Sequence, residues 1–188
     1  QNELPEVDIF LGVNEYQKLP ALLNARHAPD MVLGPLMERR VLATPSHYAY
    51  LRIAEGCDNR CSFCAIPLIR GPYQSCPMEV IFSEAEELVQ RGVKELIVIA
   101  QDTTRYGIDL YGERKLPELL ERLCGLEELQ WIRLLYAYPR DITETLLDTM
   151  IGQEKIRNYL DIPLQHVDDT LLQRMGRRSR MAEIEDLY

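Results

Sequence analysis

Three cysteines crowded into eight residues are the part of this 188-residue sequence best suited to chemistry. Cys57, Cys61 and Cys64 are separated by three and then by two residues, which is too tight for an ordinary disulfide framework. Thiolates at this spacing can reach one metal centre. A four-iron cubane takes one ligand for each iron, so three protein thiolates leave one iron with open coordination.

An open iron can bind a small molecule directly. It can chelate the amino and carboxylate groups of S-adenosylmethionine (SAM), pass one electron into the sulfonium, and break a carbon–sulfur bond to give a 5′-deoxyadenosyl radical. We therefore predict one [4Fe–4S] cluster with SAM, the three cysteines being both metal ligands and catalytic residues. Phe63, directly before the last cysteine, is predicted to pack against the adenine of SAM or, alternatively, in the core.

A non-catalytic iron–sulfur or zinc-binding module is the competing class. Structural zinc usually takes four ligands from two separated pairs, and no second pair exists here. An electron carrier would close its cubane with a fourth cysteine. Cys76 is available as a fourth ligand, but we interpret it as a partly exposed bystander thiol. Cys124 falls on the apolar face of a predicted helix and is interpreted as a core residue.

Alternating strands and helices are predicted to position the cysteine loop. The predicted strands are residues 48–54, 96–100, 131–136 and 159–164, and the predicted helices are 83–91, 117–124, 142–151 and 169–175. The apolar run 96–100 is typical of a parallel strand buried on both faces. Asp141 with Glu144 is predicted to form a capping box, and Asp168 to cap the last of these helices. This alternation implies right-handed parallel crossovers, hence an open doubly wound sheet or part of a barrel.

Functional side chains of a parallel sheet gather at the carboxyl ends of its strands. Gln101, Arg133, Tyr136 and Gln165 lie on or just after successive predicted strands, so we predict that they hold SAM. Structural hydrogen bonding across the rim is the alternative for each. His166, at the same rim, is predicted to line the pocket or to be an ordinary rim residue.

Four separated blocks resemble the radical SAM methylthiotransferase family: residues 55–71, 99–107, 135–139 and 159–166. The resemblance implies an α/β fold, a partial (βα) radical SAM barrel with parallel strands over residues 41–188. Residues 1–40 would then be the C-terminal tail of an N-terminal α/β domain plus a linker. Within that tail we expect a strand over 7–12 and a helix over 15–26.

Two blocks favour the branch of the family that modifies a ribosomal protein. Residues 101–103 read Gln-Asp-Thr and residues 138–139 read Tyr-Pro, where the branch that modifies transfer RNA usually has Gln-Asn-Val and His-Pro. The resemblance implies a transferase that adds a methylthio group to the β-carbon of an aspartate in small-subunit ribosomal protein twelve. A transfer-RNA adenosine methylthiotransferase is the alternative. Residues 75–77 read Ser-Cys-Pro, where relatives commonly have Ser-Arg-Pro.

The resemblance also implies parts beyond these residues. It predicts a second [4Fe–4S] cluster in the missing N-terminal part, a C-terminal RNA-binding-like domain, and an electron donor. We interpret the chain as a piece of a longer protein that is not fully active without the rest. Contact with nucleic acid is expected only through the C-terminal domain.

Charge and hydropathy indicate which binding partners and which cellular location to expect. The formal net charge of −9 argues against binding nucleic acid through the overall field. A basic cluster of Arg174, Arg177, Arg178 and Arg180 would face a phosphate or acidic ligand, or form a solvated helix end. No apolar run approaches the roughly 18 residues of a membrane span, and the first residues do not resemble a signal peptide. We therefore predict a cytoplasmic protein with no membrane partner.

Overall fold

The computed structural model describes residues 4–12, 15, 18–27 and 40–187, and it divides the chain into two compact units, residues 1–41 and 42–188. In the first unit the helix α1 (Leu19–His27) begins later than predicted, and residues 16–17 of the predicted helix lie outside the described residues. The strand predicted over 7–12 is wrong. Val7 and Phe10 are exposed there. A strand needs a neighbouring strand to pair with its backbone N–H and carbonyl groups, and the described part of the unit contains none.

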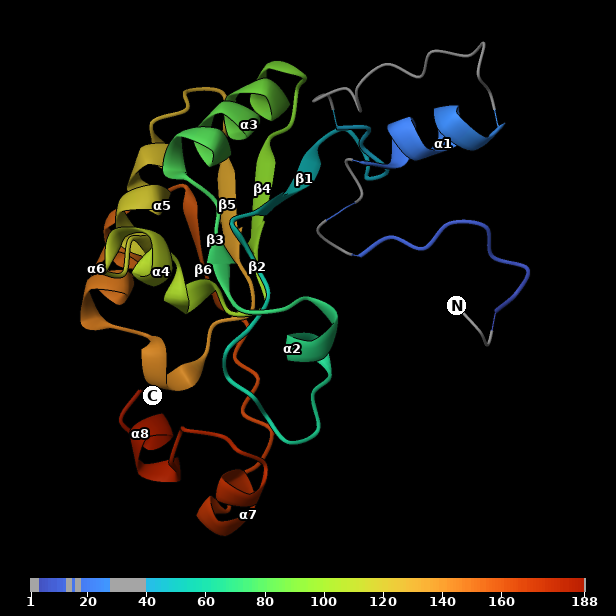
Figure 1. The fold of residues 1–188 in the computed structure, drawn as a ribbon. Helices are drawn as coiled ribbons and strands as arrows, with labels where there is room; N and C mark the ends of the chain where they lie inside the picture. The colour runs from blue at the N-terminus through green and yellow to red at the C-terminus, as the bar shows by residue number, and fades with distance from the viewer. Residues whose placement is uncertain (1–3, 13–14, 16–17, 28–39, 188) are drawn as a thin grey trace. The chain divides into compact units, whose positions relative to one another are not determined.

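The second unit is built on a four-stranded parallel sheet (Figure 1). Its strands are β1 (Tyr48–Arg52), β4 (Glu95–Ile99), β5 (Trp131–Leu134) and β6 (Ile156–Leu160). They lie side by side in the order β1-β4-β5-β6. Because the spatial order follows the chain without a reversal, the sheet winds in one direction, as in a barrel. The predicted partial barrel is confirmed.

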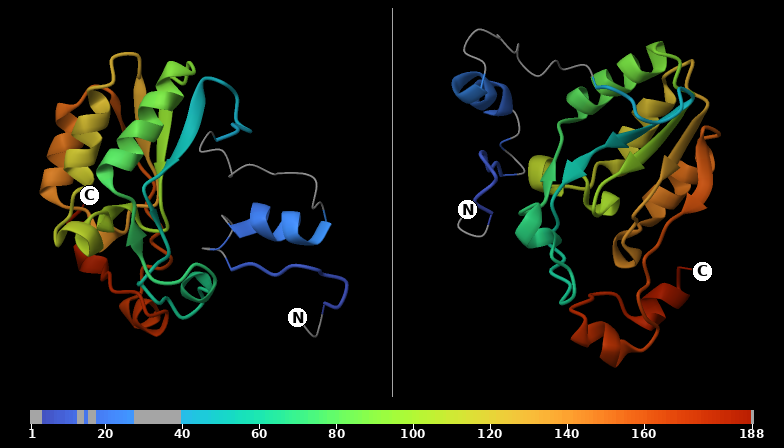
Figure 2. Two further views of the ribbon diagram at one scale, coloured as in Figure 1. Left: turned by 45° about the horizontal axis from the view of Figure 1, so that its top comes forward. Right: turned by 90° about the vertical axis from the view of Figure 1, so that its right-hand side faces the viewer.

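Helices α3 (Met78–Gln90), α5 (Leu116–Cys124) and α6 (Glu144–Gly152) cover one face of this sheet (Figures 1 and 2). The apolar spacing of α5 explains its position, because leucines at 116, 119, 120 and 123 form one stripe and all are buried. Leu96 and Val98 of β4 are fully buried, whereas Ile97 and Ile99 are only half-buried. The prediction that this strand is buried on both faces was wrong, because these helices cover a single face.

A second, two-stranded sheet holds the cysteine loop. The predicted strand 48–54 breaks at Ile53, and the chain continues as β2 (Ala54–Glu55), which pairs antiparallel with β3 (Gln74–Ser75). These two strands join the ends of the loop 56–73. The loop contains all three clustered cysteines and the short helix α2 (Ile66–Ile69).

The remaining boundaries differ in detail from the prediction. The cap of α6 is Thr143, whose Oγ1 accepts the N–H of Leu146 at 3.2 Å. The predicted Asp141–Glu144 capping box is wrong, because Asp141 belongs to a short 3₁₀ helix and pairs with Arg114.

The last strand of the sheet, β6, begins three residues before the predicted strand and ends at Leu160. Pro163 has no N–H to donate to a ladder, which disfavours a strand there. The predicted cap at Asp168 is confirmed by its Oδ1, which accepts the N–H of Leu171 at 2.9 Å. Helix α7 (Asp169–Arg174) begins after this cap and is followed by α8 (Met181–Glu185). Helix α4 (Ile108–Tyr111) lies between β4 and α5 in the chain. None of the helices in the described ranges is long and apolar enough to cross a bilayer.

Truncating the α5 stripe is expected to destabilise this unit strongly. Leu119 is fully buried, so Leu119→Ala should lower the free energy of unfolding by about 2–5 kcal/mol. Leu68 in α2 is 90% exposed, and Leu68→Ala should change it by less than about 0.5 kcal/mol. Urea unfolding followed by circular dichroism measures both, and equal effects of the two substitutions would contradict the described core.

Candidate iron–sulfur site

The neck of the cysteine loop is closed by backbone contacts. Cys57 N–H donates to the carbonyl of Gly71 at 3.2 Å. Gly56 has a φ of +76°, and a Cβ there would lie 2.1 Å from the carbonyl oxygen of Pro72. Only glycine fits such a position, both for its left-handed backbone and for the space. The sequence Gly56-Cys57 therefore sets where the first thiol emerges.

The three cysteines line one cavity of about 470 Å³ in the second unit. Other walls come from the ends of β4 and β5 and from the segment after β6. The lining residues are Arg52, Cys57, Asn59, Cys61, Phe63, Cys64, Ile66, Ile99, Ala100, Gln101, Tyr136, Tyr138, Pro163, Gln165 and Arg177. The structure thus brings together residues that the sequence placed at separate strand ends.

Four of the five residues predicted to hold SAM line this cavity: Phe63, Gln101, Tyr136 and Gln165. Phe63 is 57% exposed, so the alternative that it packs in the core is wrong. Arg133 is not among the lining residues. Its Nε donates to Glu95 at 2.8 Å, and its contact with SAM remains a prediction.

The other residues singled out from the sequence lie elsewhere. The Nδ1 of His166 accepts the N–H of Asp168 at 2.9 Å, and His166 does not line the cavity. Cys76 and Cys124 are half-buried and pack against the hydrophobic core. Burial raises the pKa of both thiols. The core interpretation of Cys124 is confirmed, and Cys76 also lies outside the cavity lining.

The four arginines of the predicted basic cluster do not all line the same cavity. Arg178 and Arg180 line a second cavity of about 440 Å³, and Arg177 lines both cavities. Arg174 belongs to the last turn of α7 and lines neither.

The backbone is in an unusual conformation around the cysteine cavity. Among the described residues, those other than glycine that have positive φ are Arg60 (51°), Tyr136 (59°) and Gln165 (71°). Such conformations cost free energy and persist where surrounding contacts hold them. The carbonyl of Tyr136 accepts the N–H of Thr103 at 3.1 Å, and its N–H donates to Asp161 at 3.3 Å. Tyr136, which lines the cavity, is therefore held in this conformation by contacts of its own backbone.

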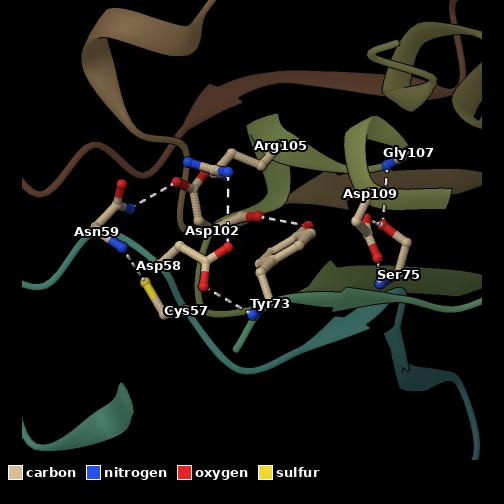
Figure 3. Close-up of polar contacts among 9 residues, drawn as sticks. All are labelled: Cys57, Asp58, Asn59, Tyr73, Ser75, Asp102, Arg105, Gly107 and Asp109. Atoms are coloured by element: carbon tan, nitrogen blue, oxygen red, sulfur yellow. Dashed lines mark hydrogen bonds and ion pairs between the residues drawn. The ribbon is translucent and has the colours of Figure 1, made fainter. Parts of the chain in front are cut away.

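A buried polar network beneath the cysteine loop was not predicted (Figure 3). The Nδ2 of Asn59 donates to Asp102 at 2.8 Å, and the hydroxyl of Thr104 donates to the same carboxylate at 2.6 Å. The hydroxyl of Tyr73 donates to the backbone carbonyl of Asp102 at 2.9 Å. Asp102 is 1% exposed. It thus anchors the cysteine loop to the end of β4.

Two further pairs stabilise the ends of the loop (Figure 3). Asp58 accepts the N–H of Tyr73 at 3.2 Å and lies 3.7 Å from the guanidinium of Arg105. Asp109 accepts both the N–H and the hydroxyl of Ser75, at 2.8 and 2.6 Å. Arg105 and Asp109, which both lie between β4 and α5 in the chain, therefore fix the start of the loop and strand β3.

The cysteine sulfurs receive hydrogen bonds from the protein. The N–H of Asn59 donates to Cys57 Sγ at 3.5 Å, and Nη1 of Arg177 donates to Cys61 Sγ at 3.8 Å. Burial raises the pKa of the Cys57 thiol, although the Asn59 N–H opposes this. Iron binds the thiolate, so metal binding must release this proton.

The residues fit a cluster with one open iron. The three thiols are free of disulfides and share one cavity, and Oε1 of Gln101 in its wall is buried without a hydrogen-bond partner. Within the described ranges, no three cysteine, histidine, aspartate or glutamate side chains already converge on a single metal position. The donor set, three soft thiolates, is the one that iron–sulfur clusters use.

Neutralising Asp102 is expected to change how stability depends on pH. Burial raises its pKa above the ordinary value of 3.8, so the protonated form favours the fold and this contribution is lost as pH rises through the raised pKa. Asp102→Asn cannot ionise, so the stability of the variant relative to wild type should increase with pH over that range. Urea unfolding of the metal-free chain at a series of pH values measures the difference.

The control for this series is Asp109→Asn, which removes an exposed carboxylate bonded to Ser75. Parallel stability curves for wild type and Asp102→Asn would show that ionisation of the buried carboxyl group does not oppose folding.

Comparison with known proteins gives the family. The family model for the radical SAM superfamily matches residues 51–187. A ribosomal protein uS12 methylthiotransferase RimO of Clostridium kluyveri is 51% identical over 96% of this chain and 43% of its own length. The RimO protein of Alkaliphilus oremlandii is 48% identical over 100% of this chain and 43% of its own length. The chain therefore spans less than half the length of these curated relatives.

Among solved structures, the radical SAM methyltransferase TsrM of Kitasatospora setae superposes with a TM-score of 0.59 at 18% identity. The match covers 79% of this chain and 31% of TsrM, and it supports the fold. The predicted resemblance to the methylthiotransferases is confirmed by the similarity to the RimO proteins. On the match of the family model to residues 51–187, this chain belongs to the radical SAM superfamily.

Proposed function

We propose that this chain is the cluster- and SAM-binding part of an enzyme that adds a methylthio group to the β-carbon of an aspartate in ribosomal protein uS12. The observation that carries the proposal is the identity of about half of all residues, over nearly the whole chain, with proteins named for that activity. The cavity lined by Cys57, Cys61 and Cys64 supports it.

Cys57, Cys61 and Cys64 would hold a [4Fe–4S] cluster. With SAM bound, such a cluster supplies the electron that cleaves a carbon–sulfur bond of SAM and so provides a radical able to take hydrogen from an unactivated carbon. A β-carbon C–H bond is too weakly acidic for removal by an ordinary side-chain base. The chain's own contribution is to hold the thiolates, orient SAM, and bring the substrate to it.

The walls of the cavity suit the two ends of SAM. Phe63 presents an exposed ring at the cavity, which would stack on an adenine. Gln101 offers a buried carbonyl oxygen without a partner, which would accept a hydrogen bond from the amino group. Tyr136 and Gln165 also line the cavity and would contact the bound SAM. A second [4Fe–4S] cluster and the electron donor would lie outside this chain.

Removing the amide of Gln101 is expected to weaken SAM binding. Losing one hydrogen bond costs up to about 1.5 kcal/mol, so Gln101→Leu should raise the Kd of the reconstituted protein for SAM by up to roughly tenfold. Gln130 is exposed outside the cavity, and Gln130→Leu should leave the Kd unchanged. Arg133→Gln tests the remaining predicted contact in the same assay. An unaltered Kd for Gln101→Leu would remove this residue from the site.

The proposed function is tested with the full-length protein, uS12, SAM and a chemical reductant under anaerobic conditions. Tandem mass spectrometry should find one methylthio group in place of a hydrogen on a single aspartate of uS12. Transfer RNA incubated in parallel should remain unmodified. Modified adenosine in the transfer RNA with unmodified uS12 would overturn the assignment of substrate, and no modification of either would overturn the assignment of activity.

A further inference from the structure

The segment after α7 packs directly on the cysteine loop. The carbonyl of Met175 accepts the N–H of Ser62 at 2.8 Å. Gly176 has a φ of +68°, and a Cβ there would lie 3.2 Å from the carbonyl oxygen of Arg60. Residues 175–177 therefore lie against the stretch that carries Cys61, far away in the sequence.

Three contacts hold the guanidinium of Arg177 in place. It lies 4.3 Å from the centre of the Tyr138 ring, donates to the carbonyl oxygen of Pro163, and donates to Cys61 Sγ at 3.8 Å. Its Nε is buried without a partner. A half-buried guanidinium held in this way has little freedom to turn away from the sulfur.

The positive charge of Arg177 is not neutralised by these contacts. Its partners in the described part of the chain are a sulfur, a carbonyl oxygen and an aromatic ring, none of which is a carboxylate. Arg52, another arginine of the cavity wall, pairs instead with Glu55. Arg177 is thus the lining arginine whose charge is directed at a cysteine sulfur.

We propose that Arg177 is a positioning residue that raises the reduction potential of the cluster held by Cys57, Cys61 and Cys64. Reduction adds one electron to the cluster and so one negative charge, without a bond or a proton changing place. A cation with an N–H directed at a ligand sulfur stabilises the more negative, reduced state. The inference rests on the proposed cluster, but it requires neither SAM cleavage nor a particular substrate.

The test is an anaerobic potentiometric titration of the reconstituted 188-residue chain with dithionite, followed by electron paramagnetic resonance. Arg177→Gln removes the charge but keeps a donor. At the wild-type midpoint potential, its ratio of reduced to oxidised cluster should fall about tenfold. Arg177→Lys keeps the charge but loses the planar stack. Its ratio of reduced to oxidised cluster should lie between those of wild type and Arg177→Gln. Arg178→Gln, at an exposed neighbour, should match wild type.

Iron and sulfide counts on each variant separate the outcomes. Full loading with an unshifted potential in Arg177→Gln would overturn the inference and leave the proposed function intact. Loss of the cluster in the Gln variant but not in the Lys variant would still show that the charge acts on the cluster. Loss in both variants, with unchanged circular dichroism, would show that the cluster needs the shape of Arg177 rather than its charge, and would overturn the inference. A wild-type chain without iron would overturn the proposed cluster itself.

Discussion

Replacing any one of Cys57, Cys61 and Cys64 by alanine is expected to reduce the iron content of the reconstituted chain from about four atoms to near zero. Two remaining thiolates cannot hold a cubane stably, because two irons would then lack protein ligands. Cleavage of SAM to 5′-deoxyadenosine should fall to background in the same variants. Iron analysis and chromatography of the nucleoside products measure the two effects.

The chain supplies matched controls for these variants. Cys76→Ala and Cys124→Ala remove thiols that pack against the hydrophobic core and do not line the cavity, so iron content and SAM cleavage should stay near wild type. Loss of iron in Cys76→Ala but not in Cys64→Ala would mean that a different set of thiols holds the metal.

Gly56→Ala is expected to have the next largest effect. A Cβ at this position would lie 2.1 Å from the carbonyl oxygen of Pro72 and 2.7 Å from that of Gly71, so backbone must move and the neck of the loop must open. Added to the cost of a left-handed alanine, about 1 kcal/mol, this should lower the free energy of unfolding by about 3 kcal/mol. The displaced Cys57 should also bind iron poorly. Urea unfolding and iron analysis measure the two results.

Gly71 provides the matched comparison, because it has a φ of +77° and a Cβ there meets nothing within 4 Å. Gly71→Ala therefore carries the conformational cost without the clash and should destabilise by about 1 kcal/mol. If the two variants lost the same stability, the close approach of Gly56 to Pro72 would be contradicted.

The parts of the site that were predicted are those that depend on local sequence. The spacing of Cys57, Cys61 and Cys64 is a local pattern, and the end of β4 places Gln101 beside them because parallel strands share one rim. The burial of Leu119 and Leu123 follows from helical spacing. Each of these features depends on a short stretch of sequence and not on contacts between distant residues.

The parts that were missed depend on contacts between distant residues. Asn59 and Asp102 lie 43 positions apart and meet in a buried hydrogen bond, and nothing in either local sequence indicates the partner. The sequence predicts Arg177 only as one member of a basic cluster, whereas its stacking on Tyr138 is set by tertiary packing. The half-buried Ile97 was mispredicted for a related reason, since an apolar run does not show how many helical layers cover it.

The cap of α6 shows a similar limit at short range. Asp141 and Glu144 have the spacing of a capping box, yet Thr143 caps the helix. Asp141 is paired instead with Arg114, from a different part of the chain. The pairing of Asp141 with Arg114 depends on tertiary packing, which the local sequence around residue 141 does not indicate.

Cys57, Cys61 and Cys64 would hold a cluster with one iron open to SAM. Electron paramagnetic resonance of the reduced, anaerobically reconstituted chain, recorded with and without SAM and paired with iron counting, tests this arrangement. We expect about four irons per chain and a signal that shifts when SAM is added. Retained zinc, or a cluster signal that SAM leaves unchanged, would contradict it.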